Sequence, residues 1–171
     1  MEALRIITEE HQNLWRIATT LDMVADEIDA GGKLEAPFFS SVFDYIEQFM
    51  DLAHHAKEDE YFFPALRARS SEADAILDRL QAEHRNGPEV LKELRAKLAL
   101  TAAGGDNNAA FTSALRTYTQ SLKNHIRTEE KDAMPLARLE AAARAIEDQL
   151  VGDGAPAVAV WPGVGAGVVV A

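Results

Sequence analysis

Cysteine is absent from the 171 residues of the chain. This absence excludes disulfide bonds, thiolate-ligated iron–sulfur clusters and a cysteine nucleophile. Basic residues are scarce as well, since 17 Lys and Arg stand against 28 Asp and Glu, for a net charge of -11. An acidic surface argues against a nucleic-acid backbone or an anionic membrane as partner. The N-terminal residues lack a basic segment followed by an apolar run, so we expect no signal peptide and a cytoplasmic protein.

No segment alternates strongly enough between apolar and polar residues to predict a sheet. Apolar residues instead recur at steps of three, four and seven, which indicates amphipathic helices. Four long helices with short loops between them are predicted, at residues about 2–30, 37–69, 72–100 and 109–133. We therefore expect an all-α fold, an up-down-up-down four-helix bundle with a short C-terminal helix and an irregular tail.

The domain organisation follows from a change in composition near the C-terminus. Residues 1–151 are expected to form one bundle domain, and residues 152–171 a tail rich in Gly, Val and Ala. The tail is about as long as a membrane span, but its prolines and glycines make it a poor helix. Within the bundle, Pro88 follows Gly87 and cannot donate a hydrogen bond to the carbonyl of residue 84. This pair predicts a kink or a break in the third helix.

One polar pattern occurs twice along the chain. Glu-His-x-Asn stands at 10–13 and again at 83–86, and His-x-x-x-Glu with a second acid follows at 54–59 and at 125–130. A histidine and a glutamate four residues apart share one face of a helix. The doubled pattern therefore places one inward imidazole on each of the four helices, together with two inward carboxylates.

This combination is hard to bury without a cation. Two buried, unpaired carboxylates would cost several kcal/mol, and no inward Lys or Arg is predicted in the same registers. Imidazole and carboxylate together suit iron, manganese or zinc. The predicted metal ligands are one histidine on each helix and the two glutamates, namely His11, His54, Glu58, His84, His125 and Glu129.

This ligand set can hold two metals. Each glutamate lies one turn beyond a histidine and can span two metals while the histidines complete the coordination. Two octahedral ions offer twelve positions, and four histidines, two bridging carboxylates and a bridging oxide or hydroxide leave about one position open on each. An open position on a redox metal, enclosed by Leu, Phe and Met, suits dioxygen or nitric oxide.

His55 competes with His54 for a place in this set. It pairs with Asp59 at the same i, i+4 spacing, but the alignment of the two copies favours His54, because Ile126 is the residue that matches His55. His55 therefore stays an alternative ligand, or else a residue that supports the ligands or lies on the surface. Glu10 and Glu83 repeat one residue off the inner face, where we expect them to be solvated or to orient a neighbouring helix.

The doubled motif, over roughly residues 1–150, resembles the hemerythrin-like family, also called the HHE cation-binding domain. The resemblance implies a four-helix bundle with a non-heme di-iron centre, bridged by two carboxylates and held by the six residues above. Oxygen-carrying members have five histidines, two of them four residues apart on the third helix. Here the residues four before and four after His84 are Leu80 and Pro88. The pattern is closer to the four-His, two-Glu branch associated with nitric-oxide and oxidative-stress response.

Several functions fit these residues. We expect a di-iron protein that binds dioxygen or nitric oxide in sensing, scavenging or stress response. An enzyme that acts on peroxide or nitric oxide, or that donates iron for repair, would use the same residues, and the sequence does not separate the two. A metal store or a structural metal site would be closed to small ligands. A ferritin-like protein would need repeated Glu-x-x-His pairs, and the nearest match, Asp51-x-x-His54, occurs once. The sequence gives no oligomeric state.

Overall fold

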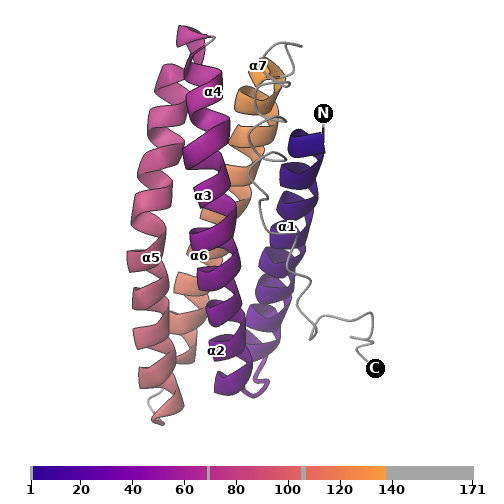
Figure 1. The fold of residues 1–171 in the computed structure, drawn as a ribbon. Helices are drawn as coiled ribbons and strands as arrows, with labels where there is room; N and C mark the ends of the chain where they lie inside the picture. Colours follow the sequence, from indigo (N-terminus) through magenta and orange to yellow (C-terminus); the bar gives the residue numbers. More distant parts are fainter. Residues whose placement is uncertain (1, 69, 105–106, 138–171) are drawn as a thin grey trace.

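Four helical rods run side by side, with neighbours in sequence antiparallel, in the computed structural model of the chain (Figure 1). The structure describes residues 2–68, 70–104 and 107–137. Within these ranges there is no strand. The all-α four-helix bundle predicted from the apolar periodicity is therefore confirmed.

The first rod is the helix α1 (Glu2–Asp29), and the third is α5 (Asp74–Ala102), which follows a short 3₁₀ turn, η3 (Ser71–Ala73). The other two rods alternate between α-helix and the wider π-helix. The second consists of α2 (Ala36–Tyr45), η1 (Ile46–His54), α3 (His55–Lys57), η2 (Glu58–Phe62) and α4 (Phe63–Arg67). The fourth consists of α6 (Asn108–Thr128), η4 (Glu129–Ala133) and α7 (Met134–Ala137).

Two rod ends lie at residues that favour the beginning or the end of a helix. Pro37 lies in the first turn of α2, where its missing N–H costs no helical hydrogen bond. The first rod ends at Gly31, whose φ of 95° is the left-handed conformation that favours glycine. The N–H of Gly31 donates to the carbonyl of Ile28 at 3.0 Å, which satisfies one of the last free carbonyls of α1.

Of the kink or break predicted after His84, the break does not occur. The helix α5 is continuous from Asp74 to Ala102 with Pro88 inside it. A proline removes one hydrogen bond from a helix, and packing of the long apolar face of α5 against α6 and α2 outweighs that loss. His84 therefore stays on the same inner face as Leu80 and Leu91, which are both buried.

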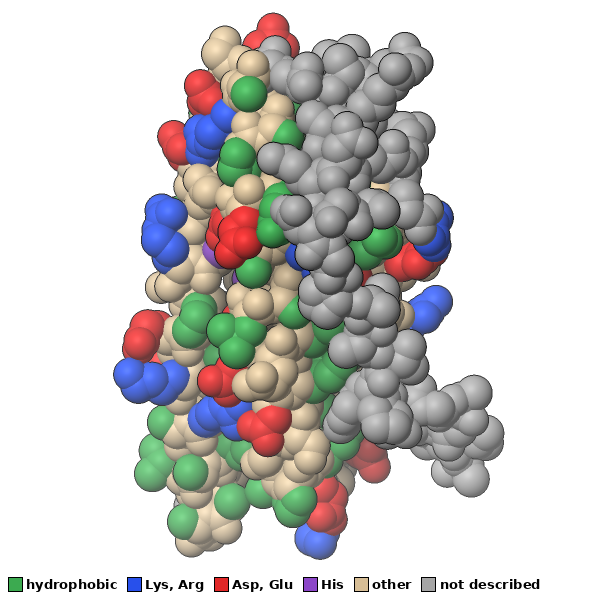
Figure 2. Space-filling model, viewed as in Figure 1, with side chains coloured by type: hydrophobic (Ala, Val, Ile, Leu, Met, Phe, Trp, Pro, Cys, Tyr) green, Lys and Arg blue, Asp and Glu red, His purple; other side chains and the backbone are tan. Residues whose placement is uncertain are grey.

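The apolar core is divided into two clusters along the bundle. One cluster includes Leu21, Phe43 and Phe111, and the other includes Phe63 and Leu77. Between them lies a layer of buried histidine and glutamate. On the face shown in Figure 2, only small areas of histidine reach the surface. The polar layer is thus enclosed above and below by packed side chains.

Two predictions fall outside the described part of the chain. The short helix expected at 136–151 lies almost wholly beyond residue 137, and the tail at 152–171 lies entirely beyond it. None of the helices that the structure describes is both long and apolar enough to cross a membrane.

Candidate metal centre

Each rod contributes its histidine where its backbone passes the polar layer. His11 lies on α1 and His84 on α5, while His54 ends η1 and His125 lies one turn before η4. The second and fourth rods are π-helical next to their metal-binding motifs, at η1, η2 and η4. Such stretches widen a helix locally and are frequent at functional sites.

The histidines and glutamates of this layer form two groups. The first group contains His11 and His54, and the second contains His84 and His125 together with His55. Glu58 belongs to both groups. Each residue of a group offers one ligand atom, and these atoms lie within 4.8 Å of one another. Every residue named in the predicted ligand set therefore lies in this layer, and the structure adds His55.

The two central carboxylates face both groups at once. Glu58 directs Oε1 toward Nε2 of His11 at 3.4 Å and directs Oε2 toward Nε2 of His84 at 3.6 Å. Glu129 directs Oε2 toward Nε2 of His11 at 3.1 Å and directs Oε1 toward Nε2 of His125 at 3.2 Å. A carboxylate whose two oxygens serve two different groups has the arrangement that a bridge between two metals needs.

The polar atoms of the layer fit a cation. All four carboxylate oxygens of Glu58 and Glu129 are buried and have no hydrogen-bond partner among the described residues. Buried polar groups without partners are rare in folded proteins and call for an explanation, such as a bound ion. Nε2 of His84 and Nε2 of His125 converge to 3.1 Å, as two donors to one metal would. The donor set of imidazole and carboxylate suits iron, manganese or zinc.

His55 lies inside the site. Its side chain is 7% exposed, and its ring stacks on that of His84 with 3.9 Å between the centroids. The sequence was interpreted as offering either His54 or His55 as a ligand. In the structure both lie in the site, because the two neighbours face different groups. His54 lies with His11 in the first group, and His55 lies with His84 in the second. The second group thus holds three imidazoles and the first holds two.

Two acids outside the predicted set hold ligand histidines by their other ring nitrogen. Glu10 contacts Nδ1 of His54 at 2.8 Å, and Glu83 contacts Nδ1 of His125 at 2.7 Å. A carboxylate in this place fixes the imidazole tautomer and leaves Nε2 free to bind a metal. Glu10 is fully buried, so of the two roles expected for it solvation is wrong, and it contacts a neighbouring rod instead. The signal in the sequence was the repetition of Glu directly before His in both copies.

Three further acids lie near Nδ1 of the remaining histidines as ion-pair neighbours. Asp59 lies 3.1 Å from Nδ1 of His84, Glu130 lies 3.4 Å from Nδ1 of His11, and Asp51 lies 3.6 Å from Nδ1 of His55. Each of the five imidazoles therefore has a carboxylate behind it. Asp59 and Glu130 are the second acids of the doubled motif. Asp51 has no equivalent in the second copy, where Leu122 occupies the matching position.

A buried lysine contradicts one expectation. Lys57 is 7% exposed and its ammonium contacts Glu10, although the sequence predicted no inward Lys or Arg near the motif. It does not neutralise the central carboxylates, because its partner is the acid behind His54. The central pair of glutamates thus has only imidazoles around it among the described residues.

The carboxylates change the proton affinity of the imidazoles. Burial lowers the pKa of His11, but the nearby carboxylates of Glu129, Glu130 and Glu58 outweigh burial and raise the pKa well above its usual value. Burial opposes the charge on His125 too, yet Glu129 and Glu83 raise its pKa to about 10. Burial also raises the pKa of Glu129, and His125, His11 and His84 more than reverse that effect. A cation that binds here must therefore displace protons from the imidazoles.

Residues 2–137 match the family model described as the hemerythrin HHE cation binding domain. Neither the search of curated proteins nor the search of solved structures returned a match to this chain. The matched range contains both copies of the histidine–glutamate motif and both groups of the candidate centre. It also covers well over half of the chain. The chain therefore belongs to the hemerythrin HHE cation-binding family.

Proposed function

We propose that this chain is a non-heme di-iron protein that binds a small diatomic ligand, dioxygen or nitric oxide, at one open metal position. The observation that carries the proposal is the placement of the two central carboxylates. Each of Glu58 and Glu129 presents one oxygen to His11 and the other to the histidines of the second group. A single metal would leave one oxygen of each carboxylate buried without a partner, at a cost of a few kcal/mol.

Counting ligands assigns the open position to the first group. In the second group, three imidazoles, two carboxylate oxygens and one shared solvent-derived bridge would fill an octahedral ion. In the first group, His11 and His54 supply one ligand fewer. The asymmetry comes from His55, because Ile126 replaces it in the second copy.

When bound, iron supplies a reducible centre with a vacant coordination position for a diatomic molecule. The surrounding residues have separate tasks. Glu10 and Glu130 hold the imidazoles of His54 and His11 with Nε2 directed toward the site. Ile7 and Leu14 lie one turn on either side of His11, and both are 0–1% exposed, so they exclude bulk water from the first group. A neutral diatomic molecule loses little hydration on entering such surroundings, whereas an ion would lose much.

The experiment that tests the proposal combines metal analysis with ligand binding. The full chain, produced with added iron, should contain two irons, and its optical spectrum should change reversibly when the reduced protein meets dioxygen or nitric oxide. Glu58→Ala and Glu129→Ala should each lose metal, whereas the exposed Glu60→Ala serves as a control that keeps it. Two metals retained in both central variants would contradict the bridging assignment.

The same samples separate the alternatives. Sustained consumption of peroxide or nitric oxide by the iron-loaded chain would favour an enzyme over a carrier or sensor. Net loss of iron to an acceptor protein would favour iron donation. A single zinc, or metal without any response to either diatomic ligand, would favour a structural or storage site.

A further inference from the structure

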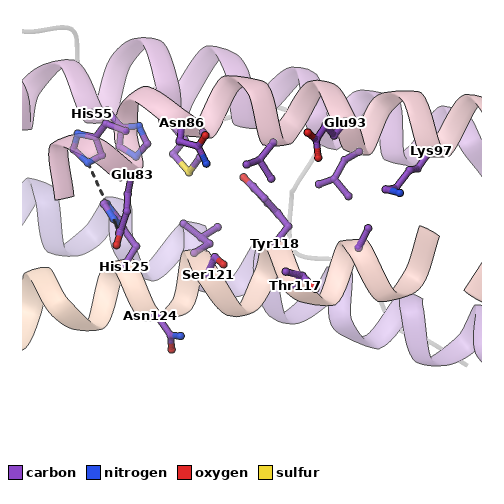
Figure 3. A pocket seen from close by; sticks show the side chains of 17 residues that line it. His55, Glu83, Asn86, Glu93, Lys97, Thr117, Tyr118, Ser121, Asn124 and His125 are labelled. Atoms are coloured by element: carbon purple, nitrogen blue, oxygen red, sulfur yellow. Dashed lines mark hydrogen bonds and ion pairs between the residues drawn. The ribbon is translucent and has the colours of Figure 1, made fainter. Parts of the chain in front are cut away.

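A cavity of about 550 Å³ opens beside the second group, between the third and fourth rods. His55 and His125 lie at one end of it, and Glu93, Thr117 and Lys97 lie toward the other (Figure 3). The volume is within the range of small-molecule sites, about 300–1,000 Å³. It is many times the size of a diatomic molecule. The cavity is therefore larger than the proposed function of the metal centre requires.

The walls of the cavity have the composition of a ligand site. Its buried floor is apolar, with Met50, Leu94 and Leu122 each less than 9% exposed. Its rim is polar and exposed, and includes Asn86 and Ser121. An apolar floor with a few polar groups in fixed places is typical of pockets that bind organic molecules.

Tyr118 supplies the fixed polar group. It projects from α6 toward α5 between the two ends of the cavity (Figure 3). The residue is 6% exposed, and its hydroxyl has no hydrogen-bond partner among the described residues. Burial, with the nearby Asp51, raises the pKa of Tyr118, so the hydroxyl keeps its proton and can donate it. A buried donor without a partner is costly, and a ligand that accepts its hydrogen bond recovers that cost.

The charges at the exposed rim of the cavity disfavour an anion. The rim contains the carboxylates of Glu83 and Glu93 and the ammonium of Lys97, which sum to one negative charge, while the imidazoles of the second group lie at one end of the cavity. The chain as a whole carries a net charge of -11. An anion would meet repulsion at the rim and a desolvation cost on the floor.

We propose that this cavity binds a neutral organic molecule with an apolar body of ring size and one hydrogen-bond-accepting oxygen. Tyr118 donates to that oxygen, and the body packs between Met50, Leu94 and Leu122. The molecule lies against the group whose ligand count leaves no open position, so it occupies a site separate from that of the diatomic ligand. The inference rests on the cavity and on Tyr118, and it does not depend on which metal the centre holds.

Equilibrium dialysis of the full-length, iron-loaded protein against 2-naphthol tests the inference. This probe has an apolar two-ring body and one hydroxyl oxygen, and it is neutral at pH 7. We expect saturable binding of one molecule per chain. Tyr118→Phe should weaken it by about three- to tenfold, because one hydrogen bond is lost. Ala114→Leu, which fills the cavity wall with a larger side chain, should abolish it.

Matched controls make the outcomes decisive. Tyr61→Phe removes the hydroxyl of a tyrosine that packs against the other apolar cluster, and it should leave binding unchanged. 2-Naphthoate, with the same body and a negative charge, should bind more weakly than 2-naphthol. The inference is overturned if no binding saturates, if Tyr118→Phe and Ala114→Leu both bind like the parent, or if the anion binds as tightly as the neutral probe.

Metal content is measured on the same samples, which separates this inference from the proposed function. Two irons per chain without 2-naphthol binding would overturn only the organic-ligand site. Binding of 2-naphthol with the expected variant pattern, in a chain that takes up no iron, would overturn only the di-iron proposal.

Discussion

The two halves of the bundle support their ligands in the same way and depend on each other. Within each half, the glutamate before the first histidine binds the second histidine, as Glu10 does with His54 and Glu83 with His125. Between halves, the second acid of one motif binds the first histidine of the other. Asp59 contacts His84, and Glu130 contacts His11 in return. The doubled motif therefore encodes these acids as well as the proposed ligands.

Two of the differences between the halves lie between the histidine and the glutamate of the motif. The first half has His55 and Lys57, where the second has Ile126 and Thr128. Because of Lys57, Glu10 can be fully buried, whereas the side chain of Glu83 is 44% exposed and lies beside Arg79. The comparison teaches that a nearly two-fold arrangement becomes asymmetric through differences between the proposed ligands, with His55 and Lys57 present in the first half only.

Removing Lys57 should have the largest effect on stability. Lys57→Met removes the cation that faces the buried carboxylate of Glu10, and breaking a buried ion pair costs about 3–5 kcal/mol of unfolding free energy. The matched change in the other half, Arg79→Met, breaks an exposed pair and should cost less than about 1 kcal/mol. Urea unfolding at equal metal content measures both. Equal losses of unfolding free energy in the two variants would contradict the proposed asymmetry. Adding Glu10→Gln to Lys57→Met should restore part of the lost stability.

Removing His55 should change the metal count. His55→Gln takes one imidazole from the second group and leaves both bridging carboxylates in place. We expect the chain to hold one metal tightly and the other weakly, because the depleted group has lost a ligand. Metal analysis after dialysis against a mild chelator gives the stoichiometry. The exposed Gln12, next to His11, offers a control through Gln12→Ala. Two tightly held metals in His55→Gln would remove His55 from the ligand set.

Weakening the supporting acids should reduce metal affinity without abolishing it. Glu10→Gln and Glu83→Gln each keep the shape of the side chain but remove the charge behind an imidazole, and such changes cost about 10- to 100-fold in metal affinity. The buried Glu10 should lie at the upper end of that range and the half-exposed Glu83 at the lower end, since water screens the latter. Chelator competition measures both. A larger loss of metal affinity in Glu83→Gln than in Glu10→Gln would contradict this expectation.

Raising the pH should lower the stability of the metal-free chain and raise the affinity of the chain for metal. The folded pKa of His125 is raised to about 10 from an ordinary value of 6.5. Without metal, its contribution to stability is therefore fully present below about pH 6.5 and is lost as the pH rises through about 10. Metal binding must displace such protons, so metal affinity should rise with pH between about 6 and 8. Chelator competition across this range, with calorimetry for the released protons, tests the sign, and pH-independent affinity would contradict it.

Much of the fold was predictable because apolar periodicity sets which face of each helix is buried. Helix limits near Asp29 and Arg67 follow from glycine and polar signals in the chain. The break expected near Pro88 was wrong, because a local rule about one hydrogen bond could not include the packing of the whole α5 face. The metal-binding residues could be proposed because the motif occurs twice, which no single histidine could have justified.

The rest of the site depends on geometry that one sequence does not contain. A regular helix directs His54 and His55 about 100° apart, so only one of them was expected to face inward. The second rod is π-helical on both sides of these residues, and both are buried. The burial of Glu10 depends on the reach of Lys57 from another rod, which periodicity along one helix does not reveal.

The division of the core has a consequence for how the molecule opens. Each end of the bundle has an apolar cluster with residues from all four rods, whereas the layer between them consists largely of buried polar side chains, many of whose atoms have no hydrogen-bond partner among the described residues. A metal pair bound there would act as a crosslink among four segments that are distant in sequence, and it would couple the two clusters. Removing the metal should accordingly speed hydrogen exchange most at the amides beside the polar layer.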